Sequence, residues 1–241
     1  MRLPLDIALL KTLQRGAGRL ADEARAAVRS YVRGQMAADG SFVNRAGKSD
    51  LYYTMFGWMM CHALSIPSDA GMRETYLRHI DPSDLDALHL SVYRQCVLLH
   101  DLMKNGLVRA ALSHWGDRHH LEEFMAQFAG HTVGRTLNGT AASLFASRQT
   151  EEDMQEKVRE IQVLQDQTGG FYANEGAAMP DLLSTAVALF TLRTQQQKSR
   201  YDASDFIEAH FQEDGSFMPN LLDEQSDVEY CFYGLLALGA S

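Results

Sequence analysis

Gln212-Glu-Asp-Gly215-Ser-Phe217 is followed, after a short loop, by Ser226-Asp227-Val-Glu-Tyr-Cys231-Phe-Tyr-Gly234-Leu235. The same order of residues recurs twice in the chain: residues 35–42 are followed by residues 49–58, and residues 165–171 are followed by residues 180–189. After each aspartate comes Leu or Val at +1, Thr or Cys at +4, Gly or Ala at +7 and a large apolar residue at +8. These four positions fall on one face of an α-helix. Each copy therefore predicts a helix that begins at its aspartate.

An amphipathic stretch precedes each Gly-x-Phe segment, at 20–36, 154–165 and 203–211. We expect the glycine to end that helix and the phenylalanine to hold the loop against it. The unit is then a helix hairpin that recurs about every 45 residues. The small residue at +7 should let another helix approach closely, which predicts tight helix–helix contacts at Gly57, Ala188 and Gly234.

Weaker copies fill the middle of the chain. One begins at Pro82-Ser83-Asp84-Leu85 and keeps a small residue, Ser91, at +7. Another would join an outer helix at 122–128 to an inner helix at 140–147. An extra helix is expected at 5–13, before the first hairpin.

The second helix of the strong units is apolar on nearly every side, as 55–64 and 231–238 show. A helix that is apolar all round is buried all round. This favours the inner wall of a double ring, so the predicted fold is an all-α, single-domain α/α toroid over 1–241, with about five hairpins and an N-terminal helix. An open stack of helix pairs, as in HEAT or tetratricopeptide repeats, is the alternative.

The composition narrows the functional classes. The chain has 241 residues, 46% of them apolar, and a formal net charge of −9. This charge disfavours a nucleic-acid groove, which needs clustered Lys and Arg. No stretch approaches the roughly 20 apolar residues of a membrane span, and Asp6 and Lys11 interrupt the N-terminal apolar run, so no signal peptide is expected. Three widely spaced cysteines suggest free thiols and a cytoplasmic location.

The Gln-x(2–4)-Gly-x-Phe turn with its following aspartate and apolar helix resembles the "QW" repeat of squalene–hopene cyclases. It is also similar to the repeat in the β subunits of protein prenyltransferases. The resemblance covers 18–64 and 150–241 and is faint over 65–149. Both families form an α/α toroid with a central apolar cavity. The resemblance therefore implies an isoprenoid-handling enzyme that binds a prenyl or prenyl diphosphate chain. A non-catalytic toroid that binds a lipid, peptide or protein partner is the alternative.

The families' catalytic motifs are only partly present. Class II terpene cyclases use Asp-x-Asp-Asp, whose middle aspartate protonates an alkene. Asp84-Leu85-Asp86-Ala87 keeps the first and third positions, so the resemblance implies Asp86 as the acid and Asp84 as the residue that orients it. Prenyltransferase β subunits hold zinc with Asp-x-Cys, but the residues two after the repeat aspartates include no cysteine; they are Tyr52, Asp86, Leu183 and Glu229. Zinc is therefore not expected.

The four aspartates Asp50, Asp84, Asp181 and Asp227 should gather at one mouth of the ring, since each is expected to start an inner helix. Helix capping explains each of them alone. The additional carboxylates Asp86, Asp223 and Glu229 are harder to explain as caps. Near an apolar cavity such a group has a raised pKa and can act as a general acid. It could equally bind Mg²⁺ if the substrate carries a diphosphate, so the cofactor stays open.

Aromatic residues are concentrated on the predicted inner helices. Core packing is the default interpretation of this pattern. If they line the cavity instead, their faces could stabilise carbocations. The predicted substrate-binding set combines carboxylates and aromatics: Asp50, Tyr52, Tyr53, Phe56, Trp58, Asp181, Asp227, Glu229, Tyr230 and Tyr233.

Overall fold

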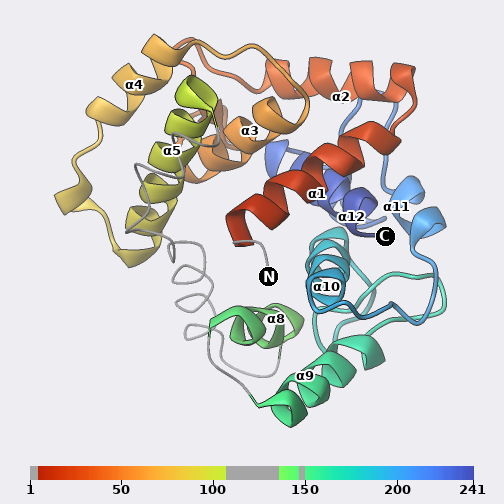
Figure 1. Cartoon of the computed structure of the whole chain (residues 1–241). Helices are drawn as coiled ribbons and strands as arrows, with labels where there is room; N and C mark the ends of the chain where they lie inside the picture. Colours follow the sequence, from red (N-terminus) through yellow and green to blue (C-terminus); the bar gives the residue numbers. More distant parts are fainter. Residues whose placement is uncertain (1–4, 107–135, 147–149) are drawn as a thin grey trace.

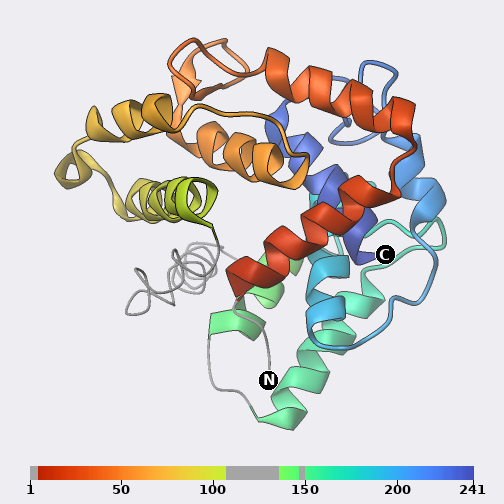
Figure 2. The same ribbon diagram turned by 45° about the horizontal axis from the view of Figure 1, so that its top comes forward.

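The computed structural model describes residues 5–106, 136–146 and 150–241, which are mainly α-helical (Figures 1 and 2). The helices are α1 (Leu5–Arg19), α2 (Asp22–Gly34), α3 (Leu51–Ala63), α4 (Ala70–Arg78), α5 (Ala87–Asn105), α8 (Leu137–Ala146), α9 (Glu151–Val163), α10 (Leu182–Thr194), α11 (Ser204–Ala209) and α12 (Val228–Ala240). A 3₁₀ turn, η1 (Pro82–Asp84), precedes α5. Two short antiparallel strands, β1 (Phe42–Val43) and β2 (Ser49–Asp50), lie in the loop before α3.

The helices form two layers. The inner helices contact one another in the spatial order α5, α3, α12, α10 and α8. Outside them lie α4, α2, α11 and α9, each beside the inner helix of its own or a neighbouring hairpin (Figure 1). The helices that follow Asp50, Asp181 and Asp227 are thus inner helices, as predicted. One apolar cluster includes side chains of both layers, from Leu9 to Ala240.

The last hairpin packs on the first, which an open stack of hairpins would not do. A Cβ placed on Gly215, in the loop before α12, would lie 2.2 Å from the backbone of Ala27 in α2. Arg45 Nε, in the loop before α3, lies 2.8 Å from Asp227 Oδ2 at the start of α12. The inner helices α3 and α12 also touch. The described helices therefore close on this side, as the toroid prediction requires.

The remaining hairpin is described only in part. The inner helix expected at 140–147 is present as α8, Leu137–Ala146. The outer helix expected at 122–128 lies outside the described residues, which leave out 107–135 between α5 and α8.

The repeated threonine joins each loop to its inner helix. The backbone N–H of Phe42 donates to Thr54 Oγ1, and that of Phe171 donates to Thr185 Oγ1, both at 2.9 Å. Each threonine hydroxyl in turn donates to the carbonyl of the repeat aspartate four residues earlier. In the last unit Cys231 takes this place, and its thiol lies 3.9 Å from the carbonyl oxygen of Gly215. One polar side chain thus fixes the position of each phenylalanine.

The small residue at +7 accommodates this phenylalanine. A Cβ on Gly57 would lie 2.1 Å from Phe42 Cγ, and one on Gly234 would lie 2.5 Å from the ring of Phe217. Both rings are almost fully buried, and burial of a phenylalanine side chain stabilises a fold by about 2–3 kcal/mol. The prediction of a close helix–helix contact at these glycines is therefore wrong. The ring from the unit's own loop fills the space where another helix was expected.

The inner helix of the weak copy begins later than predicted. Asp84 is the last residue of η1, whose cap is Asp81. Leu85 is extended (φ −87°, ψ 138°), and Asp86 accepts a hydrogen bond from the N–H of His89 at 2.8 Å. The prediction that Asp84 begins this helix is wrong by two residues, because Asp86 satisfies the free N–H groups of the first turn.

Helix α1 lies across the middle of the arc of inner helices (Figures 1 and 2). It continues to Arg19, beyond the predicted end at residue 13, and contacts α12, α3 and α10. It crosses α12 at two glycines: a Cβ on Gly16 would lie 2.0 Å from the Leu235 carbonyl oxygen, and one on Gly239 would lie 1.9 Å from that of Thr12. This close helix–helix contact thus uses glycines outside the repeat.

Candidate functional site

The starts of three inner helices lie at the same end of the arc. Asp50, Asp181 and Asp227 cap α3, α10 and α12, and each carboxylate accepts backbone N–H groups of the following turn. The N–H of Leu182 donates to the carbonyl of Pro219, in the loop before α12. Capping thus accounts for these three predicted residues. Because the starts of the three helices lie at the same end, the side chains that follow the caps are also close together.

A carboxyl group and four aromatic rings lie between the first turns of α12 and α3. We call this set, Glu229, Tyr52, Phe56, Phe232 and Tyr233, the Glu229 cluster. The hydroxyl of Tyr52 donates to Glu229 Oε1 at 2.8 Å. The Phe56 ring lies 4.9 Å from Tyr52, 4.8 Å from Phe232 and 6.0 Å from Tyr233, between ring centroids. Two inner helices, far apart in the chain, thus contribute to one acidic and aromatic site.

The carboxyl group of Glu229 is held partly neutral by its surroundings. Burial raises its pKa to about 7, and the nearby charge of Asp227 acts in the same direction. Hydrogen bonds from Tyr52 and Tyr233, and the charge of Arg45, act in the opposite direction. Burial also raises the pKa of both tyrosines well above the ordinary value, so both hydroxyls remain donors. A carboxyl group with a pKa near neutrality can donate a proton at physiological pH.

Asp227, two residues earlier, has a different partner. Its side chain is buried and forms an ion pair with Arg45 at 2.8 Å, and the Arg45 guanidinium lies 5.6 Å from the centroid of the Tyr230 ring. The hydrogen bond to Asp227 is the main cause that raises the pKa of Arg45. The negative charge of Asp227 is therefore matched locally, while Glu229 has tyrosine donors and aromatic rings around it. Two neighbouring carboxyl groups in such unlike environments are typical of acid–base sites.

The repeat explains why these residues meet. Positions +1, +4, +7 and +8 face the loop of their own hairpin, as Thr54 and Gly57 do. Tyr52 and Glu229 are both at +2, and Phe56 and Tyr233 are both at +6, so these residues turn toward the neighbouring inner helix. The predicted substrate-binding set contains these four residues and leaves out Phe232, the fifth member of the cluster, at +5. Comparing the +2 residues of adjacent inner helices would have shown the Tyr52–Glu229 pair.

The other predicted aromatics lie around this cluster or apart from it. The ring of Tyr53 lies 5.9 Å from Tyr52, and that of Tyr230 lies 6.1 Å from Tyr233. Burial raises the pKa of Tyr53 and of Tyr230 to about 12. Trp58 is fully buried on the opposite side of α3, where its indole N–H donates to the Gly40 carbonyl at 2.9 Å. Trp58 therefore packs α3 on its own loop.

Asp86 lies in an environment that a proton donor to an alkene cannot use. Its side chain is 66% exposed and accepts from both the backbone N–H and the ring of His89. The backbone hydrogen bond is the main cause that lowers the pKa of Asp86, so the group stays charged. The predicted acid had to be neutral and dry; Asp86 is neither. Asp84 is exposed at the end of η1, and Asp223 accepts a loop N–H from Gln225.

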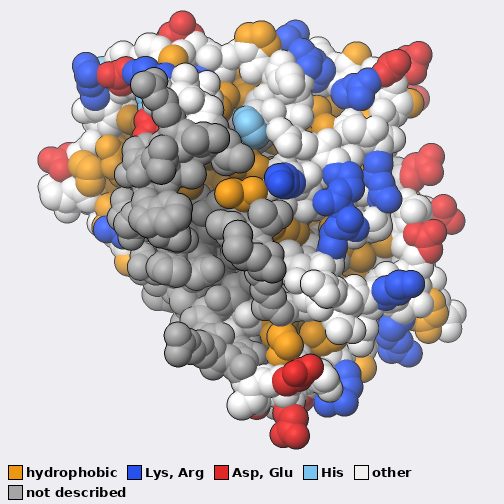
Figure 3. Space-filling view, viewed as in Figure 1, with side chains coloured by type: hydrophobic (Ala, Val, Ile, Leu, Met, Phe, Trp, Pro, Cys, Tyr) orange, Lys and Arg blue, Asp and Glu red, His pale blue; other side chains and the backbone are white. Residues whose placement is uncertain are grey.

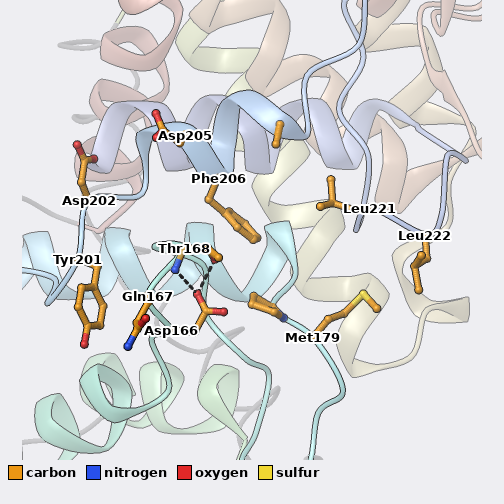
Figure 4. Close-up of a pocket in the computed structure, with 12 residues that line it drawn as sticks. Asp166, Gln167, Thr168, Met179, Tyr201, Asp202, Asp205, Phe206, Leu221 and Leu222 are labelled. Atoms are coloured by element: carbon orange, nitrogen blue, oxygen red, sulfur yellow. Dashed lines mark hydrogen bonds between the residues drawn. The ribbon is translucent and has the colours of Figure 1, made fainter.

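A separate groove of about 760 Å³ lies between the start of α11 and the loops before α10 and α12 (Figure 4). Phe206, Met179 and Leu221 give it an apolar side, while Asp166, Asp202 and Asp205 lie around its other side (Figure 4). Asp166 is already bonded to the N–H and hydroxyl of Thr168. None of the Glu229 cluster lines this groove.

Comparison with known protein families identifies the fold independently. The model of the prenyltransferase alpha-alpha toroid domain matches residues 118–239, just over half of the chain. The chain belongs to this family. Searches of curated proteins and of solved structures find no significant match. Membership indicates a prenyl-related function. Glu229 falls within the matched segment, whereas Tyr52 and Asp86 lie before it.

Two further properties concern the described residues alone. In 5–106, 136–146 and 150–241, no three His, Cys, Asp or Glu side chains gather in a way that could hold a metal ion. Within these same ranges, no helix has the length and apolar character needed to cross a bilayer.

Proposed function

We propose that this chain is an isoprenoid-handling enzyme that binds a prenyl chain against the inner helices and protonates one of its double bonds. The observation that carries the proposal is Glu229: a carboxyl group whose pKa is about 7, hydrogen-bonded to Tyr52 and enclosed by aromatic rings. Family membership supports the prenyl substrate. In this proposal Glu229 takes the role that the sequence assigned to Asp86.

The chemistry follows from the residues of the Glu229 cluster. The protonated carboxyl group gives its proton to one alkene carbon, and the π electron pair becomes the new C–H bond. The other alkene carbon is left as a carbocation, which the faces of Phe56, Tyr52 and Tyr233 would stabilise. Capture of the cation by a second double bond forms a C–C bond and moves the positive charge to another carbon. Loss of a proton to water from a carbon beside the cation then forms a new double bond and ends the reaction. Solvent then returns a proton to the Glu229 carboxylate.

The test compares two carboxyl variants of the full-length chain. Wild type, Glu229→Gln and Asp86→Asn are incubated with squalene, farnesyl diphosphate and geranylgeranyl diphosphate in D₂O, and products are identified by mass spectrometry. We expect one solvent deuterium per product from wild type, a similar rate from Asp86→Asn, and a rate lower by about 10²–10⁴-fold from Glu229→Gln. Products without solvent deuterium, or full turnover by Glu229→Gln, would reject the role of Glu229.

A ring that binds without catalysis is the second candidate, and α1 is the observation that favours it. This helix occupies the middle of the arc and packs on three inner helices. In that case, calorimetry would detect binding of the same isoprenoids, and no product would be formed. A lipid, peptide or protein would then be the natural ligand.

We also propose that the protein works in the cytoplasm. Cys61, Cys96 and Cys231 are free and buried, a usage that is typical of proteins in reducing compartments.

A further inference from the structure

Three arginines converge on the C-terminal end of α12, opposite the end that carries Glu229. Arg15 of α1 donates to the Gly239 carbonyl at 2.9 Å, and Arg19 donates to the Leu238 carbonyl and to Ser241 Oγ, both at 2.6 Å. Arg193 of α10 lies 3.4 Å from the Ala240 carbonyl. Two separate helices thus bring positive charge to four consecutive residues.

A groove of about 410 Å³ lies beside this helix end. We call it the basic groove. Its lining combines the ends of α10 and α12 with the turn that follows α10, and its polar side chains include Arg193, Gln196, Gln197, Lys198, Ser199 and Arg200. Figure 3 shows Lys and Arg side chains gathered over the region where Figure 1 draws α1 and the C-terminus. The chain as a whole carries a net charge of −9, so these cations lie on an acidic protein.

The positive charge here exceeds what the helix end can neutralise. A helix C-terminus corresponds to roughly half a negative charge, whereas three guanidinium groups reach this one. After burial, the charges of Arg193 and Arg19 are the causes that lower the pKa of Arg15, because the three repel one another. Among the described residues, none of the three forms an ion pair with a carboxylate, and neither do Lys198 and Arg200.

The lining has one acidic side chain, Asp202. It accepts the backbone N–H and the hydroxyl of Ser204, at 2.9 and 2.8 Å, and its charge interacts with that of Arg19. The side chains of Gln196, Gln197 and Ser199 add neutral hydrogen-bond donors beside the cations. A groove with several donors and more cationic than acidic side chains suits an oxyanion with many acceptor oxygens.

We propose that the basic groove binds the phosphate group of an anionic ligand. The site is distinct from the Glu229 cluster, since Glu229 and Ala240 are separated by eleven residues of α12, or about 16 Å along the helix. The inference therefore does not depend on the proposed enzyme activity. The phosphate could belong to a soluble phosphate compound or to a lipid headgroup, and these sources can be separated by experiment.

The experiment uses the full chain and a charge-reversed pair. Lys198→Glu with Arg200→Glu removes two exposed cations that cap no helix. The matched control, Arg33→Glu with Lys48→Glu, makes the same charge change at exposed residues outside the groove. Inorganic pyrophosphate is titrated by calorimetry, and vesicles of phosphatidylcholine, with and without phosphatidic acid, are tested by co-sedimentation. Circular dichroism checks that each variant is folded.

We expect wild type and the control to bind at least one of the two phosphate probes, and the groove variant to bind it on the order of tenfold more weakly or less. Binding should weaken as salt is added, because exposed charges are screened. Pyrophosphate binding would identify a soluble ligand, and binding only to phosphatidic acid vesicles would identify a headgroup. If neither probe binds wild type, or if the groove variant and the control bind equally, the proposal is wrong. If the charge-reversed pair fails to fold, Lys198→Arg with Arg200→Lys is tested in its place. This variant keeps the charges and should retain binding.

Discussion

The starts of α5 and α12 each carry a carboxyl group that the repeat places two residues after an aspartate. At α12 the aspartate is the cap, so Glu229 is within the helix and turns toward Tyr52 of the neighbouring inner helix. At α5 the helix begins two residues later, and the second aspartate, Asp86, becomes the cap. The pKa of Glu229 is raised to about 7, whereas that of Asp86 is lowered. The position of the cap thus decides which of two similar carboxyl groups can act as an acid.

The largest expected effect concerns the packing of α12 on the phenylalanine of the loop before it. Gly234→Leu should lower the free energy of unfolding by about 3 kcal/mol, because the new side chain would overlap the buried ring of Phe217. Gly18→Leu is the control, since a Cβ there meets nothing within 4 Å. Urea denaturation measures both. Equal stabilities for the two variants would show that the phenylalanine under the +7 residue does not support the inner helix.

The second effect is the opposite pH dependence of the two carboxyl groups. The folded chain keeps a proton on Glu229 up to a pKa of about 7, whereas the ordinary value is 4.5. As the pH rises, the unfolded chain loses this proton before the folded chain does. Glu229 therefore makes folding less favourable as the pH rises from about 4.5 to 7, by about 3 kcal/mol. Glu229→Gln should therefore become more stable than wild type between pH 5 and pH 8.

Asp86→Asn provides the comparison for this measurement. The pKa of Asp86 is lowered from 3.8, so the stability it contributes is present above the unfolded value and is lost only as the pH falls below it. By urea denaturation at each pH, its stability relative to wild type should change far less from pH 5 to pH 8 than that of Glu229→Gln. A parallel gain in both variants would mean that the surroundings of Glu229 do not raise its pKa.

The sequence predicted the architecture from its repeat because local constraints decide it. Thr54, Thr185 and the three phenylalanines act within a single hairpin, and their spacing can be read directly. The pairing of Tyr52 with Glu229 depends on which hairpins become neighbours when the ring closes, and 177 residues separate the two. The start of α5 was misplaced because two aspartates, Asp84 and Asp86, compete for the cap, and only the extended backbone at Leu85 shows which one wins. The motif pointed to Asp86, whereas the raised pKa of Glu229 depends on burial against a neighbouring helix, which no motif records.

A third, smaller effect tests Asp86 as a cap. Asp86→Ala should lower the melting temperature by a few degrees, because the N–H of His89 loses its acceptor. Asp86→Asn should keep most of that stability, since asparagine also caps helices well. Differential scanning calorimetry compares the two. A melting temperature unchanged in Asp86→Ala would mean that the carboxylate does not fix the start of α5.

The smallest effect lies within the Glu229 cluster. The hydroxyl of Tyr52 favours the charged form of Glu229, because it donates a hydrogen bond to Oε1 at 2.8 Å. Tyr52→Phe removes this donor and should raise the pKa of Glu229 by up to about one unit. An acid must be protonated to act, so the rate of product formation falls as the pH rises through this pKa, and the fall should move to higher pH in the variant.

Tyr53→Phe is the matched control: the ring is adjacent, and among the described contacts its hydroxyl has no bond to Glu229. The pH–rate profile of each variant, together with the pH dependence of its unfolding, reports the same group by two routes. If the two profiles coincide, Tyr52 does not tune the pKa of Glu229, and the difference between the starts of α5 and α12 comes from burial and the other neighbouring charges.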